Sequence, residues 1–202
     1  ALIWRLLMVG TPAAVTGVQR AMSQLAFILV VAPFGDGAVA AFALTRRAEN
    51  VANQGSRGLG RAAGALAGQN LGAGLRGRAR DSVTWAIVYV AVGSLVLAAL
   101  FLLFPETIAS LFSGDEEFVH RAGRWLTIIA IGYFFMNAVQ VFTQAFNTTG
   151  DTFAPMLVTL GTVWMFEIPL AFGLSNYTGL DEYGVPWAIV TGMILRTAVF
   201  SW

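Results

Sequence analysis

Residues 60–74 read GRAAGALAGQNLGAG and lie in the second of six apolar blocks. Gly60, Gly64, Gly68 and Gly72 recur at every fourth residue, a spacing that places them on one face of an α-helix. Glycine inside a helix costs about 1 kcal/mol relative to alanine. A row of small residues does, however, let the backbones of two membrane helices approach closely. We therefore expect this face to pack against a neighbouring helix and the helix to bend easily.

The composition is that of an all-α membrane protein. The 202 residues are 57% hydrophobic and 11% charged, with a mean hydropathy of +0.70, whereas soluble domains carry about 25% charged residues. A helix needs about 20 apolar residues to cross a bilayer. Six blocks meet this length and are predicted to form one transmembrane bundle: 7–33, 38–72, 79–104, 122–147, 153–174 and 184–202. The second is too long for one straight span, so one end should project or bend.

Residue counts exclude several kinds of site. The chain has no cysteine, which rules out disulfides, thiolate metal sites and cysteine nucleophiles. His120 is its single histidine and cannot form a histidine metal site alone. The net charge of +1, with no basic stripe interleaved with aromatic residues, argues against a nucleic-acid partner. We find no His-Glu-x-x-His, Gly-x-Ser-Gly or paired aspartates in the predicted spans, so we expect neither an enzyme nor a cofactor.

The loops predict an orientation. Residues 74–80 hold three arginines, and short loops rich in arginine stay in the cytoplasm. The connections after the third and fifth predicted helices instead carry carboxylates: Glu106, Asp115, Glu116, Glu117, Asp181 and Glu182. This alternation predicts that both ends of the segment are cytoplasmic, in the cell (inner or plasma) membrane. Residues 105–121 are of mixed composition and fit either a short interfacial helix or an ordinary loop.

Polar side chains recur at helical spacing inside three of the predicted spans. Such residues are rare within a membrane and usually face a cavity or a partner. They are Thr16, Gln19, Arg20, Ser23 and Gln24 in the first span, Arg46, Arg47, Glu49, Asn50, Asn53, Gln54 and Arg57 in the second, and Asn137, Gln140, Gln144 and Asn147 in the fourth. Three stripes turned toward one another predict a water-accessible pocket in mid-membrane. The alternative is polar contact that only holds helices together, at about 1 kcal/mol for each residue.

Two carboxylates within the predicted spans are candidates for a functional role. At a rise of 1.5 Å per residue, Glu49 and Arg20 lie at similar depth, so Glu49 is expected to pair with Arg20 or Arg46. Glu167 stands two residues before Pro169, which removes a helical hydrogen bond and frees a carbonyl. Glu167 is predicted either to bind a proton or sodium ion at this opened helix, or to lie at a kink near the outer interface.

Several stretches resemble, in order along the chain, the multidrug and toxic compound extrusion (MATE) family. GQNLGAG at 68–74, followed by arginines, is similar to the end of the family's eighth helix, and GDGAVAA at 35–41 to the turn before that helix. Residues 47–50, RAEN, occupy its Arg-x-Glu position. QAFNTTGDT at 144–152 resembles the connection between the tenth and eleventh helices, and FEIPLA at 166–171 a motif of one prokaryotic subgroup.

The resemblance implies twelve helices in two bundles, with residues 1–202 as the C-terminal six-helix bundle. The chain begins at Ala1 just before a predicted span and ends within another, so we expect it to be part of a longer protein. The implied partners are membrane lipid, the N-terminal six-helix half of the same protein, and small organic cations or amphipathic drugs.

The resemblance also implies secondary active export of these compounds in exchange for protons or sodium ions. Among the acidic positions that couple to the ion in the family, only Glu49 has a match here, because position 137 is asparagine. The ion-coupling candidates are Glu49 and Glu167. The cavity candidates are Gln19, Arg20, Gln24, Arg46, Asn50, Asn53, Asn137, Gln140 and Gln144.

Two other functions remain open at this stage. One is a flippase for lipid-linked sugars of the same superfamily, which needs several cations to hold a pyrophosphate. Five arginines could supply them: Arg20, Arg46, Arg47, Arg57 and Arg61. The other is a membrane scaffold without transport activity, in which the polar stripes serve assembly alone.

Overall fold

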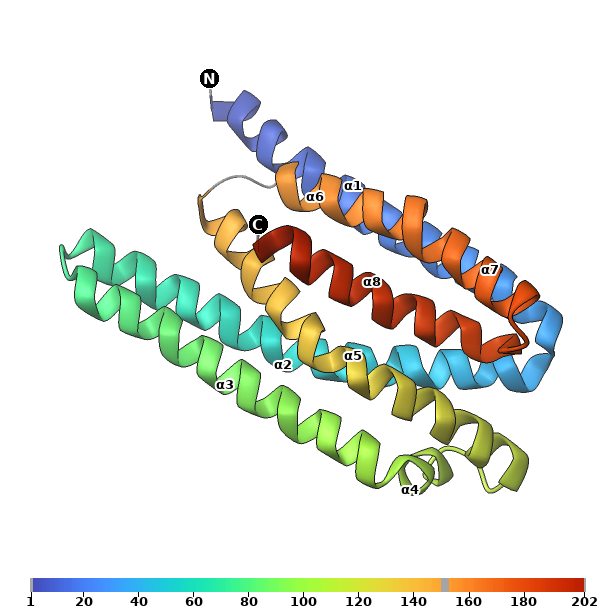
Figure 1. The fold of residues 1–202 in the computed structure, drawn as a ribbon. Helices are drawn as coiled ribbons and strands as arrows, with labels where there is room; N and C mark the ends of the chain where they lie inside the picture. Colours follow the sequence, from blue (N-terminus) through green and yellow to red (C-terminus); the bar gives the residue numbers. More distant parts are fainter. Residues whose placement is uncertain (1, 150–152, 202) are drawn as a thin grey trace.

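The computed structural model describes residues 2–149 and 153–201. Within these ranges each of the six predicted blocks contains one long helical segment (Figure 1). Five are single α-helices: α1 (Leu2–Val31), α2 (Asp36–Gly72), α3 (Arg76–Leu103), α5 (Glu116–Thr149) and α8 (Gly184–Ser201). The remaining one joins α6 (Phe153–Gly161), the π-helical turn η2 (Thr162–Glu167) and α7 (Ile168–Tyr177). Short helical turns lie between them: η1 (Ala32–Phe34), α4 (Pro105–Ser110) and η3 (Asp181–Tyr183).

Helix α2 is longer than the membrane is thick. Its 37 residues form one unbroken helix, about 55 Å long at the usual rise, against a hydrocarbon core of about 30 Å. It runs side by side with α3 to a tight turn at 73–75 (Figure 1). Gly74 in this turn has φ of +75°, a left-handed conformation that favours glycine. The α2–α3 hairpin is thus long enough to project beyond the hydrocarbon, as expected from its length.

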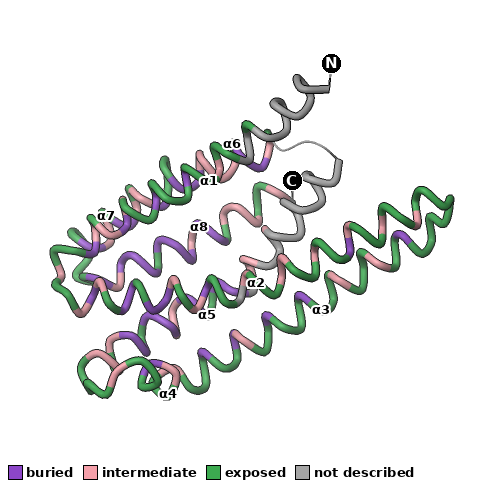
Figure 2. Tube along the Cα trace, turned by 180° about the vertical axis from the view of Figure 1, so that it is seen from behind, coloured by how far each residue is buried: buried purple, intermediate pink, exposed green. Residues whose placement is uncertain are grey.

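The core is centred on α5 and the helices that surround it. Trp125, Leu126 and Ile129 of α5 are fully buried, and the Trp125 ring meets Phe42 of α2 edge-on at a centroid distance of 6.0 Å. Buried positions gather along α5 and α8 (Figure 2). Gly132 lets these two helices approach, because a Cβ there would lie 2.8 Å from the sulfur of Met193. Packing around α5 therefore fixes α2 and α8 relative to each other.

The outer surface of the bundle is apolar. Helix α3 exposes large side chains such as Trp85, Tyr89 and Leu103, an arrangement suited to lipid. Four stretches of the described residues are long and apolar enough to cross a membrane: Ala14–Phe34, Arg76–Leu103, Phe153–Tyr177 and Asp181–Phe200. Helix α2 is not among them, since charged residues such as Arg46, Arg47 and Glu49 interrupt it.

The charged residues outside the bundle are segregated by end. The arginine-rich α2–α3 turn lies at one end, while α4 and the α7–α8 turn lie at the other (Figure 1). At this second end Arg121 Nη2 lies 2.8 Å from Glu117 Oε1, and its Nη1 lies 3.4 Å from Glu182 Oε2. His120 Nδ1 lies 3.0 Å from Glu106 Oε1. One end of the bundle thus carries arginines, and the other carries carboxylates of which three contact Arg121 or His120.

The mixed segment 105–121 contains a short helix, so it is more than an ordinary loop. It contains the six-residue helix α4, and its last part belongs to α5, which begins at Glu116 rather than near 122. Asp115 explains the earlier start, because its Oδ2 accepts a hydrogen bond of 3.1 Å from the backbone N–H of Phe118. Glu116 and Glu117 in the first turn also suit the positive end of the helix dipole.

Candidate functional site: a charged pocket within the bundle

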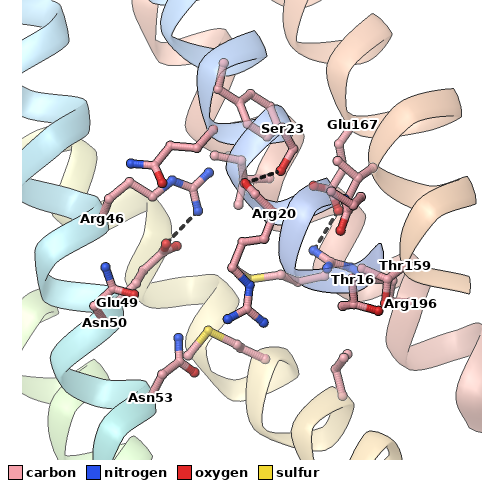
Figure 3. Close-up of a pocket in the computed structure, with 18 of the residues that line it drawn as sticks. Thr16, Arg20, Ser23, Arg46, Glu49, Asn50, Asn53, Thr159, Glu167 and Arg196 are labelled. Atoms are coloured by element: carbon pink, nitrogen blue, oxygen red, sulfur yellow. Dashed lines mark hydrogen bonds and ion pairs between the residues drawn. The ribbon is translucent and has the colours of Figure 1, made fainter. Parts of the chain in front are cut away.

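A pocket of about 230 Å³ opens between α1, α2, α5, the bent helix α6–η2–α7 and α8 (Figure 3). It brings together eight of the eleven cavity and ion-coupling candidates: Gln19, Arg20, Gln24, Arg46, Glu49, Asn50, Asn53 and Glu167. The side chains of Asn137, Gln140 and Gln144 lie outside the described residues. Helix α5 nevertheless reaches the pocket through Met136 and Val139. The polar faces of α1 and α2 thus meet at one cavity, on which Glu167 also borders.

Glu49 is held by Arg46 of its own helix. Arg46 Nη1 donates to Glu49 Oε2 over 2.6 Å, and the two side chains are 23% and 7% exposed, respectively. The Arg46 guanidinium also lies 5.0 Å from the ring centre of Phe42 and 5.5 Å from that of Phe27, within cation–π range. Of the two partners expected for Glu49, the structure selects Arg46, since residues three apart share a helix face.

Glu49 keeps one oxygen without a hydrogen bond. Oε2 is taken by Arg46, but the buried Oε1 has no such partner among the described residues. A buried hydrogen-bond acceptor without a donor is costly unless another group or an ion binds to it. Glu49 lines the pocket, and a proton or a cation bound at this oxygen would relieve the cost.

Glu167 is the second buried carboxylate, with 2% of its surface exposed. It ends the π-helical turn η2, which directly precedes Pro169 in the first turn of α7. Arg196 Nη2 of α8 lies 2.7 Å from Glu167 Oε1 (Figure 3). The structure thus places Glu167 at the bend of its helical segment and in the wall of the same pocket as Glu49.

Gly192 makes this ion pair possible. A Cβ added at Gly192 would overlap the carboxylate of Glu167. Because glycine has no side chain, Glu167 fits against α8 and reaches Arg196, which lies one helical turn further on. The bend in the sixth long segment and the glycine on its neighbour therefore act together to position one carboxylate.

Arg196 and Gly192 were not identified from the sequence. Arg196 is the one charged residue in the helix Gly184–Ser201. An ionisable residue inside an apolar span is by default a candidate for function, and this signal was sufficient to find it. The role of Gly192 depends on which helix faces Glu167, so no local pattern indicates it.

The pocket has an excess of positive charge. Four arginines line it, Arg20, Arg46, Arg57 and Arg196, against two glutamates. Each glutamate is paired with one arginine. Arg20 and Arg57 form no ion pair in the part of the chain that the structure describes, and like-charge repulsion from Arg57 and Arg196 acts on Arg20. Arg47 and Arg61, which the sequence grouped with them, do not line the pocket.

Three of the four glycines in the row of α2 face open space among the described residues. A Cβ added at Gly64, Gly68 or Gly72 would meet nothing within 4 Å among the described residues. Ala63 is buried on this part of α2, where the helix lies against α3. The predicted close packing therefore has no partner in this half of the fold, and it stays a prediction for a surface outside these residues.

The arrangement suits reversible binding of ions and charged solutes. Buried carboxylates exchange a proton or a small cation, and guanidinium groups hold carboxylates or phosphates. No cluster of three or more His, Cys, Asp or Glu side chains that could hold a metal ion occurs among the residues described.

Comparisons with known proteins agree with this architecture. The family model MatE matches residues 12–172. "Probable multidrug resistance protein YoeA" of Bacillus subtilis is 28% identical over 194 residues, which cover 94% of this chain and 42% of that protein. A "FAD transporter" of Shewanella oneidensis is 24% identical over 169 residues, which cover 84% of this chain and 37% of that protein.

The fold is also that of a solved transporter. The structure of a multidrug resistance MATE family transporter in an outward-facing conformation matches with a TM-score of 0.84 at 20% identity, over 98% of this chain and 45% of that one. The chain spans less than half the length of the relatives it matches. Because the family model covers most of the residues, the chain belongs to the MatE family of membrane transporters, which are not enzymes.

Proposed function

We propose that this chain is the C-terminal bundle of a secondary active antiporter, which exports cationic or amphipathic organic compounds in exchange for protons or sodium ions. The observation that carries the proposal is the pair of buried carboxylates, Glu49 and Glu167, in one pocket. The names of relatives support export of drugs, and that of one relative refers to FAD.

The carboxylates supply the coupling. A proton or sodium ion on Glu49 neutralises a buried charge and releases Arg46 from its ion pair. Glu167 and Arg196 respond in the same way on the other wall. Ion binding thus changes the charge of the pocket and shifts the balance between inward-open and outward-open states. A substrate whose positive group occupies the same carboxylates competes with the ion, and this competition produces exchange.

The rest of the protein completes the transport path. The N-terminal six-helix half would cover the open side of the pocket, and the two bundles would move against each other. The arginine-rich α2–α3 turn would lie in the cytoplasm, so that both ends of the segment are cytoplasmic in the cell membrane. The outer surface would then carry the ion pairs of Glu106, Glu117 and Glu182.

The experiment is dye efflux from cells that express the full-length parent protein. Ethidium efflux is followed with the proton gradient intact, after a protonophore, and after removal of sodium. We expect efflux to stop when one gradient is lost. We also expect Glu49→Gln or Glu167→Gln to abolish the gradient-driven efflux. Glu106→Gln is the matched control, because Glu106 is exposed and far from the pocket in the fold. If the folded protein produces no gradient-dependent efflux of any dye, the antiporter proposal is wrong.

The arginines of the pocket favour a lipid flippase as the second candidate function. Arg20, Arg46, Arg57 and Arg196 all line the pocket and together could hold a pyrophosphate. This candidate predicts movement of a labelled lipid-linked pyrophosphate without ethidium efflux. A scaffold without transport predicts that neither compound moves and that pocket substitutions change only assembly.

A further inference from the structure

Arg20 and Arg57, which form no ion pair in the described part of the chain, take no part in the ion exchange proposed above. Arg46 and Arg196 pair with Glu49 and Glu167, whereas Arg20 and Arg57 line the same pocket without an ion pair among the described residues. Placing like charges together is unfavourable unless a negative group joins them. A ligand with such a group would remove the repulsion that acts on Arg20. A negative group bound beside both arginines would therefore be favoured in this pocket.

The two side chains reach this site from different helices. Arg20 extends from α1 into the space between α2 and the bent helix (Figure 3). Arg57 lies eight residues beyond Glu49 on α2, about 12 Å closer to the α2–α3 turn. A guanidinium presents a planar set of donors that matches a carboxylate or phosphate. Arg57 is thus separate from Glu49 along α2, although both residues line one pocket.

The remaining wall is apolar. Met136 and Val139 of α5, Val163 of η2 and Met193 of α8 border the pocket. An organic body can rest on these side chains while its charged groups meet the arginines and the glutamates. Methionine side chains adapt to bodies of different shape.

Resting on the proposed efflux function, we propose that Arg20 and Arg57 form an anion subsite that selects amphipathic compounds bearing a carboxylate or phosphate. Exchange with a cation also requires a positive group that displaces the ion from Glu49 or Glu167. The substrate class is therefore zwitterionic: a negative group at the arginines, a positive group at the glutamates and an apolar body between them. A compound with only positive charge meets two uncompensated guanidinium groups and binds more weakly.

A matched pair of dyes tests the subsite. Rhodamine 110 carries a free carboxylate, and rhodamine 123 is its methyl ester, so the two differ only in the group that the subsite would bind. Efflux of each dye is measured from proteoliposomes that contain the full-length parent protein under an imposed ion gradient. We expect half-maximal efflux of rhodamine 110 at a concentration about tenfold lower, as one charge-assisted hydrogen bond would give.

Variants assign this preference to residues. Arg20→Gln and Arg57→Gln should each remove the preference while rhodamine 123 efflux persists, and Arg20→Lys should retain part of it. Arg61→Gln is the control, since Arg61 is an arginine of the same helix as Arg57 that does not line the pocket. Equal efflux of both dyes, with Arg20→Gln affecting both alike, would overturn the subsite and leave the antiporter proposal intact.

If neither dye is exported, a second measurement distinguishes a lipid substrate from the absence of an anion subsite. In that outcome the efflux proposal fails, and transport of a fluorescent lipid-linked pyrophosphate is measured in the same proteoliposomes. Transport that is lost in Arg20→Gln and kept in Arg61→Gln supports an anion subsite whose ligand is a lipid headgroup. No transport of the lipid overturns the anion subsite together with the efflux function.

Discussion

Arg196 of α8 and Glu167 of η2 form an ion pair of 2.7 Å across the position of Gly192. The π-helical turn that ends at Glu167 brings its carboxylate toward α8, and the missing side chain at Gly192 leaves room for it. Neither feature alone would form the pair. The bend of one helix and the glycine of another therefore set the position of one proposed ion-coupling residue.

A methyl group at position 192 should disturb this pair. Gly192→Ala places a Cβ where the Glu167 carboxylate now lies, and overpacking of this kind costs about 1–3 kcal/mol. We expect gradient-driven efflux by the full-length protein to fall toward the level of Glu167→Gln. Gly161→Ala is the control, because Gly161 lies in the bent helix that carries Glu167 and a Cβ there meets nothing within 4 Å. Normal efflux by a well-expressed Gly192→Ala protein would contradict the role of this glycine.

Removing Arg46 should destabilise the protein more than removing its neighbour. Arg46→Gln leaves the buried carboxylate of Glu49 unpaired, which costs about 3 kcal/mol, the lower end for buried pairs, because Arg46 itself is 23% exposed. The exposed Arg47→Gln should change the free energy of unfolding by no more than about 0.5 kcal/mol. Thermal unfolding of the purified full-length protein measures both.

The double variant separates the ion pair from general damage. Arg46→Gln combined with Glu49→Gln should be more stable than Arg46→Gln alone, since no unpaired charge then remains buried. If the two substitutions add without coupling, the pair contributes nothing to stability.

The orientation can be measured with introduced cysteines, because this chain contains none. Ser113→Cys lies beyond α4 and Ala73→Cys in the α2–α3 turn, at opposite ends of the bundle. In a full-length protein without other cysteines, a membrane-impermeant maleimide should label Ser113→Cys in intact cells. Ala73→Cys should react only after the cells are permeabilised, because its arginine-rich turn is expected inside. The reverse labelling pattern would show that the bundle is inverted.

The glycine row of α2 should depend on the other half of the transporter. Gly68 has open space in this bundle, so Gly68→Leu creates no clash within it. A bulky side chain should still block close approach of a helix from the N-terminal half and lower efflux several-fold. Gly93→Leu on α3 is the control, since Gly93 is also open and exposed. Equal efflux by the two variants would show that the row has no packing partner.

The sequence predicted most of the fold because apolar blocks of transmembrane length are long-range patterns that local context rarely overrides. Each of the six blocks contains one long helical segment, and the fold class is confirmed. The start of α5 was placed too late. Asp115 and the two glutamates after it resemble a polar loop in composition, although together they form a helix N-terminus.

The polar residues of the site were predictable from the sequence, whereas its ion pairs were less so. Helical spacing predicted that the polar faces of α1 and α2 meet, and it allowed Arg46 as the partner of Glu49. The pair between Glu167 and Arg196 joins helices whose neighbourhood a single sequence does not encode in any local pattern. The open face of the glycine row likewise depends on which side of α2 packs against α3.

The most direct test of coupled exchange is to drive ion movement with a gradient of the substrate. Proteoliposomes containing the full-length parent protein receive a gradient of rhodamine 110 or ethidium and no ion gradient, while internal pH and internal sodium are recorded. We predict that dye movement drives one of these ions in the opposite direction, and that Glu49→Gln abolishes the ion movement while Glu106→Gln does not. Dye movement without movement of either ion would contradict coupled exchange through the buried carboxylates.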